Sequence, residues 1–136
     1  MAYGSVLTDT VQSSTAATAP VFKDGNGTQI GTLCRAWVNF NGTGTVAIRA
    51  SFNVSSITDN GTGDYTVNFT TAMPDADYSF VAVCSASYSS SQTMTNIASN
   101  GSQTEAAPST TAMRFTNSGW NGTDYDAKYV SVAVFR

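Results

Sequence analysis

The sequence consists largely of short segments in which every second residue is expected to point to the same face of a sheet. Turns rich in Gly and Asn separate these segments. A clear case runs from Cys34 to Phe40. One predicted face carries Cys34, Ala36, Val38 and Phe40, and the other carries Arg35, Trp37 and Asn39. A period of two residues is typical of a half-buried strand, and no window of the chain keeps the 3.6-residue repeat of a helix. The chain is therefore expected to be all-β.

Further segments of this kind follow along the chain. Residues 46–54 are predicted to place Val46, Ile48, Ala50, Phe52 and Val54 on one face. A β-hairpin is predicted over residues 52–69, with its loop at 59–64. Residues 78–84 and 127–136 are apolar on both faces, so each is expected to lie inside its sheet. A total of about seven to nine short strands predicts an antiparallel β-sandwich, jelly-roll-like in its connections.

The first 33 residues differ in composition from the rest. Residues 9–20 are rich in Ser, Thr and Ala and contain almost nothing to bury, whereas residues 21–33 place two short apolar ends around Asp24-Gly25-Asn26-Gly27. The latter pattern predicts a small hairpin. We therefore expect an N-terminal attachment arm with a short hairpin at 1–33, followed by the β-sandwich at 34–136.

The composition excludes several classes of function for this chain. The chain has no histidine, two cysteines and a net charge of −3. A Ser-His-Asp or Cys-His catalytic site cannot be built without histidine, and two cysteines do not suggest a zinc site. An acidic chain is a poor ligand for a phosphate backbone. We expect no enzymatic activity, no cofactor, no metal, no nucleic-acid partner and, without a run of 18 apolar residues, no membrane insertion.

Two stretches resemble bacteriophage tail-fibre and related virion-appendage proteins of the kind found in phages of cyanobacteria and marine bacteria. The opening MAYGSVLTDTVQ is similar to the start of many such proteins. The block from Cys34 to Phe80 resembles a β module that recurs near the C-terminal end of phage fibre-like proteins. The resemblance implies a homotrimer in the virion, assembled in the host cytoplasm. It also implies that the N-terminal residues, here 1–20, bind other virion proteins. Long repetitive shafts often precede this module, and about 33 residues precede it here.

The leading hypothesis is therefore a short tail-fibre or appendage subunit whose sandwich contacts the host surface. A capsid decoration, or cement, protein that stabilises the shell is the alternative. A carbohydrate-binding module or depolymerase is a third interpretation. The absence of a basic, apolar leader in residues 1–5 favours cytoplasmic synthesis in all three cases.

Trp120, Tyr125 and Asp124 form the first candidate ligand site, in the segment NSGWNGTDYD. Aromatic faces stack on sugar rings, and nearby carboxylates and amides bind hydroxyl groups, so surface polysaccharide of the host is the expected ligand. Tyr88, within a Ser-rich segment, is the second candidate, because Tyr and Ser together make adaptable contact surfaces. The alternatives are that Trp120 packs on the core and that Tyr88 lies in a solvated loop.

The remaining candidates are weaker. Asp124 and Asp126, with Asp59 and Asp64, are compatible with a glycosidase pair or a Ca²⁺ site, but Asp in Gly/Asn turns is normally turn chemistry. Arg35 and Trp37 share a strand face, where a cation–π pair or a subunit contact competes with a half-exposed core edge. Cys34 and Cys84 are expected to stay reduced, with a disulfide as the alternative.

Overall fold

A computed structural model describes residues 8–14, 20–85, 93–97, 107–119 and 123–136. The chain forms two compact units, Met1–Leu33 and Cys34–Arg136. In the first, strands β1 (Phe22–Lys23) and β2 (Gln29–Gly31) pair antiparallel. The carboxylate of Asp24 closes their turn, since its Oδ1 accepts hydrogen bonds of 2.9 Å from the backbone N–H groups of Asn26 and Thr28. This is the hairpin that the Asp-Gly-Asn-Gly sequence predicts.

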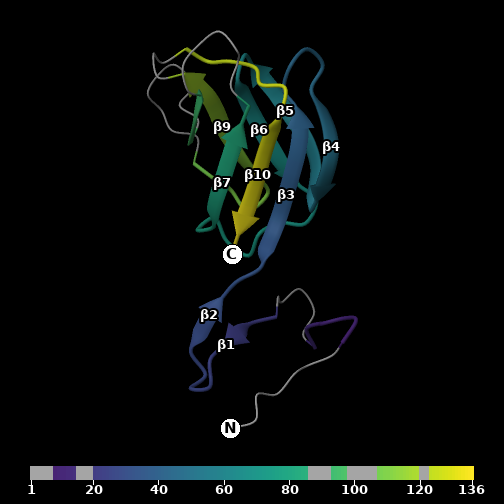
Figure 1. The fold of residues 1–136 in the computed structure, drawn as a ribbon, viewed down its shortest axis with the longest axis vertical. Helices are drawn as coiled ribbons and strands as arrows, with labels where there is room; N and C mark the ends of the chain where they lie inside the picture. The colour runs from purple at the N-terminus through teal and green to yellow at the C-terminus, as the bar shows by residue number, and fades with distance from the viewer. Residues whose placement is uncertain (1–7, 15–19, 86–92, 98–106, 120–122) are drawn as a thin grey trace. The chain divides into compact units, whose positions relative to one another are not determined.

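The second unit is an antiparallel β-sandwich, as predicted, built from two four-stranded sheets (Figure 1). The first sheet has the order β4-β3-β10-β7 and the second has the order β5-β6-β9-β8. The strands of the first sheet are β3 (Cys34–Asn41), β4 (Ala47–Phe52), β7 (Ser79–Cys84) and β10 (Val130–Phe135). Those of the second are β5 (Val54–Gly61), β6 (Asp64–Phe69), β8 (Thr93–Ile97) and β9 (Ala112–Gly119).

The last strand, β10, lies inside the first sheet, between β3 and β7. Val132 stands opposite Val38 on one side and Ala82 on the other. Val130, Val132 and Val134 point into the sandwich and are buried, whereas Ser131, Ala133 and Phe135 point outward and are half-buried. The sequence prediction of an interior position is confirmed for this segment. The same prediction for residues 78–84 is wrong, because β7 is an edge strand of the first sheet.

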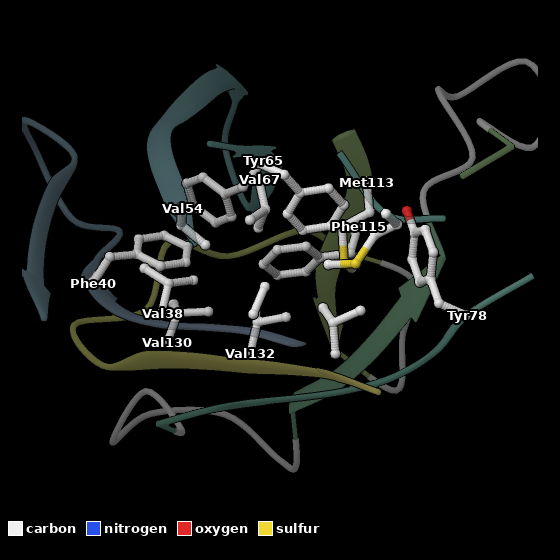
Figure 2. Close-up of a cluster of buried hydrophobic side chains, with 14 of the residues drawn as sticks. Val38, Phe40, Val54, Tyr65, Val67, Tyr78, Met113, Phe115, Val130 and Val132 are labelled. Carbon is white, nitrogen blue, oxygen red and sulfur yellow. The ribbon is translucent and has the colours of Figure 1, made fainter. Parts of the chain in front are cut away.

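The core lies between the two sheets, and its centre is aromatic (Figure 2). Phe40 of β3, Tyr65 of β6 and Phe115 of β9 are fully buried. The ring of Phe40 meets the ring of Tyr65 edge-on with centroids 5.1 Å apart, and Phe115 lies 6.4 Å from Phe40. Edge-to-face pairs of this kind add to the burial of area in stabilising the fold. Val38, Val54, Val67, Met113, Val130 and Val132 surround the three rings.

The chain passes from the first sheet to the second at Asn53. Its φ of 55° is in the left-handed region, which Asn tolerates better than most residues. The Asn53 side chain holds the corner by donating to Arg35 O at 3.1 Å and accepting from Thr71 N at 2.7 Å. Phe52 consequently faces outward from the first sheet, while Val54 is buried in the core. The predicted common face for Val46 through Val54 is therefore wrong, because the corner and a bulge opposite Asn39 and Phe40 break the alternation.

Cys34 and Cys84 are both free thiols and half-buried. They stand opposite Phe135 and Val130, at the two ends of β10. Five residues of strand separate these levels by roughly 17 Å, whereas a disulfide needs Cα atoms within about 7 Å. The expectation that the two cysteines remain reduced agrees with this geometry.

Candidate functional site

Of the predicted ligand-binding residues, the structure describes Asp124 and Tyr125. Trp120 and Tyr88 lie outside the described residues. The Asp124 side chain is exposed and accepts a hydrogen bond from the Ser118 hydroxyl, next to an isolated bridge between these two residues. Tyr125 is half-buried, and its backbone N–H donates to Asn117 O at 2.9 Å. Asp124 and Tyr125 are thus held against the end of β9. Their contact with Trp120 and Tyr88 stays a prediction.

Asp126, two residues further on, is part of the structural framework. Its Oδ1 accepts from the Tyr65 hydroxyl at 2.8 Å and from the Gly63 N–H at 2.8 Å. The same hydroxyl lies 2.9 Å from Gly42 O. Burial and the nearby Asp126 carboxylate raise the pKa of Tyr65, so the phenol keeps its proton and donates. The network ties the candidate segment to the turns before β6 and after β3.

The other paired carboxylates are also structural. Asp59 accepts from the backbone N–H of Gly61 in its own turn at 3.0 Å. Asp64 forms a bidentate ion pair with Arg114, whose Nε lies 2.8 Å from Asp64 Oδ1. Among the described residues no group of three metal-binding side chains occurs. Asp59 shows the turn chemistry that the sequence favoured for these residues, whereas the cross-strand ion pair of Asp64 was not predicted.

The outward side of the first sheet is apolar, a feature that the sequence analysis missed. One row of neighbouring residues crosses all four strands, in the order Phe52, Trp37, Ala133 and Val81. Phe52, Val81 and Val83 are 55%, 57% and 59% exposed, and Trp37 is 40% exposed. We call the outward residues Phe52, Trp37, Ala133, Val81, Val83 and Phe135 the apolar face. From sequence, the alternation of Cys34–Phe40 set Trp37 opposite the core residues, and the alternation of Val130–Phe135 did the same for Ala133 and Phe135.

At one end of this sheet, Tyr129 is exposed, and two positively charged side chains contact its ring. The Arg49 guanidinium lies 4.5 Å from the centre of its ring, and Lys128 Nζ lies 5.7 Å from it. Arg49 also donates to Lys128 O at 2.6 Å. Within the described parts of the chain, the cation–π contacts occur at this tyrosine. Arg35 and Trp37, which were considered as such a pair beside the favoured half-exposed core edge, do not form one.

The outward side of the second sheet has the opposite chemistry. Its polar side chains bond to one another across the strands. Asn68 Nδ2 donates to Thr58 Oγ1 at 2.9 Å, and Asn60 Nδ2 donates to Thr66 Oγ1 at 2.9 Å. We call this surface the polar face, made of the outward side chains of β5, β6 and β9: Ser56, Thr58, Asn60, Asp64, Thr66, Asn68 and Arg114. Hydroxyl and amide groups in such an array are suited to contacts with water or sugar hydroxyls.

Comparison with models of protein families, with curated proteins and with solved structures finds no match to this chain. In the part of the chain that the structure describes, no helix is long and apolar enough to cross a membrane.

Proposed function

We propose that this chain is a non-enzymatic structural subunit of a bacteriophage particle, a short tail fibre or related appendage. The resemblance of the Cys34–Phe80 block to a phage module supports this assignment. A small sandwich whose polar face consists largely of uncharged hydroxyl and amide groups suits a protein displayed outside the cell. The same resemblance implies three copies in each appendage.

The observation that carries the proposal is the first unit, whose own two strands leave its apolar side chains uncovered. Val21, Phe22, Ile30 and Leu33 are between 41% and 68% exposed. A two-stranded hairpin is at best marginally stable by itself, so this unit requires a binding partner. Another virion protein is the partner that the proposal assigns to it.

Attachment is tested with phage that encodes a variant of this hairpin. Ile30→Asp places a charge on the exposed apolar surface, whereas Gln29→Asp adds the same charge at an exposed polar position of the same strand. We expect purified particles to lack the Ile30→Asp protein and to keep the Gln29→Asp protein, as judged by immunoblot and immunogold electron microscopy. Retention of the Ile30→Asp protein at the normal level would refute attachment through this unit.

The host contact is proposed at Trp120, Tyr125, Asp124 and Tyr88. Several weak sites on one appendage, and several appendages on one particle, give tight attachment through multivalency. Purified protein should compete with the phage for host cells, and Trp120→Ala or Tyr88→Ala should reduce that competition, with Tyr129→Ala as the exposed aromatic control. Gold labelling spread over the whole shell, without competition for adsorption, would instead support the capsid decoration role.

A further inference from the structure

We propose that the apolar face is the surface through which copies of this chain associate with one another. The inference concerns the chain itself, so it stands or fails separately from the virion role. The contrast between the two sheets motivates it. The outward side chains described on β5, β6 and β9 form an array of bonded polar groups, whereas the outward side of the first sheet carries a row of uncovered apolar side chains.

The strand order explains why a second copy fits this face. The bulky residues Trp37 and Phe52 occupy β3 and β4, whereas Ala133 on the neighbouring β10 is small. The β3–β4 half of one copy can therefore pack over the β10–β7 half of another. In that arrangement Trp37 lies over Ala133 of the second copy, and Phe52 lies over its Val81. Large side chains meet small ones, as packing of two sheet faces requires.

The next row of the sheet is complementary in the same way. Its residues run in the order Ala50, Asn39, Ser131 and Val83 across the four strands. When the β3–β4 half of one copy covers the β10–β7 half of another, Ala50 meets Val83, and Asn39 meets Ser131. Within one copy, Asn39 Nδ2 already donates to Ser131 Oγ at 2.8 Å, so this polar pair is satisfied before association. The same pairing of halves serves a closed pair or a ring of three.

The charged residues of the first sheet are compatible with a second copy as the partner of the apolar face, and the area of that face sets the expected strength of association. Strands β3, β4, β7 and β10 contain no acidic residue, so association buries no carboxylate. Of the two basic residues in these strands, Arg49 is bonded to Lys128 O and stacked on Tyr129. Arg35 is half-buried at the start of β3, two positions before Trp37. Four strands about 4.8 Å apart and about 20 Å long present roughly 400 Å² in projection. This is about half of the area per partner of a standard interface, so the association is expected to be weak.

Sedimentation velocity of the full chain, from about 1 to 200 µM, tests the inference. We expect the wild-type chain to associate in this range. Val81→Glu and Phe52→Lys should each raise the dissociation constant by about tenfold, because each places an unpaired charge against an apolar side chain at the edge of the contact. Thr70→Glu, at an exposed position that follows β6, should leave association unchanged. Circular dichroism of dilute samples should show that every variant is folded.

The double variant Phe52→Lys with Val81→Glu tests the pairing of the two halves. Within one copy these positions lie on opposite edge strands, three strand spacings apart, so their charges do not pair internally. Between copies they meet at every contact and near the solvent-exposed edge. Two independent effects would raise the dissociation constant by about 100-fold, whereas the new charge pairs should keep the dissociation constant of the double variant about tenfold below that value.

Three results would overturn the inference. The first is a wild-type chain that stays monomeric at about 200 µM. The second is an association that Val81→Glu leaves unchanged. The third is an association abolished by Ile30→Asp but retained by Val81→Glu, which would assign the contact to the hairpin of residues 21–33. A double variant weakened by the product of the two single effects would refute the proposed pairing of halves.

Discussion

The hydroxyl of Tyr65 lies 2.8 Å from the Oδ1 atom of Asp126, a residue 61 positions away in the chain. Tyr65 is fully buried at the centre of the core, whereas Asp126 lies in the segment that leads into β10. The contact therefore connects the middle of the sandwich to a segment that the proposed function assigns to host contact.

Replacing Tyr65 by Phe should lower the free energy of unfolding by about 1–3 kcal/mol, because the buried carbonyl of Gly42 and the Asp126 carboxylate lose their shared donor. The side chain of Tyr129 is exposed, so Tyr129→Phe should change the free energy of unfolding by less than about 0.5 kcal/mol. Urea unfolding followed by circular dichroism measures both. Equal effects of the two substitutions would contradict the structural role of the Tyr65 hydroxyl.

Gly63→Ala should be much more destabilising than Gly44→Ala. The two glycines have similar φ values of 69° and 63°. A methyl group at Gly63 would lie 2.8 Å from both Asn117 O and Tyr125 N, whereas a methyl group at Gly44 has open space. Gly44→Ala should cost about 1–2 kcal/mol from backbone strain alone. Gly63→Ala should cost about 1–3 kcal/mol more through overpacking, as measured by urea unfolding. Similar losses at both positions would refute the tight packing at Gly63.

The free energy of unfolding should decrease at alkaline pH and stay constant near neutral pH. Burial raises the pKa of Tyr78 to about 12, whereas an unfolded tyrosine ionises near pH 10. The neutral phenol is favoured by the fold, so its contribution is complete below about pH 10 and is lost as the pH rises towards 12. Tyr65 acts in the same direction, since its pKa is also raised. The chain has no histidine, so little change is expected between about pH 6 and 8.

Urea midpoints measured between about pH 8 and 11 check this expectation, and Tyr78→Phe should make the alkaline decline less steep. The variant also loses the hydroxyl contacts to Ser109 O and Ala112 O, at 3.1 and 3.2 Å, so its slope is compared rather than its absolute stability. An unchanged slope would show that Tyr78 ionises equally readily in the folded and unfolded chain.

The two ion pairs should differ in their contribution to stability. Asp64 and Arg114 face each other across β6 and β9, with side chains 14% and 28% exposed, whereas Asp75 and Arg136 are about 40% exposed. A double-mutant cycle with Asp64→Asn and Arg114→Gln should give a coupling of about 0.5–1 kcal/mol, since water still screens the pair. The matching cycle at Asp75 and Arg136 should give no measurable coupling. A larger value for the second pair would contradict this ranking.

Local pattern predicted the all-β class, the hairpin over residues 52–69 and the interior position of residues 130–135. Alternation also placed Trp37 on the outward side. It failed at Phe52, because a single left-handed residue, Asn53, moves the chain from one sheet to the other. The Tyr65–Asp126 contact and the row from Phe52 to Val81 join distant segments. No local signal marks such pairs, since strand order is needed to bring them together.

The interior position of β10 has a consequence for synthesis. β3 and β7 do not pair with each other, and both of their inner edges pair with β10. The first sheet therefore remains divided until residues 130–135 have left the ribosome. Until then, the edges of β3 and β7 that pair with β10 have unpaired backbone groups. Open edges are where chains aggregate. A product that stops short of residue 130 should consequently be insoluble or rapidly degraded, which gives the cell a way to keep incomplete copies out of any assembly.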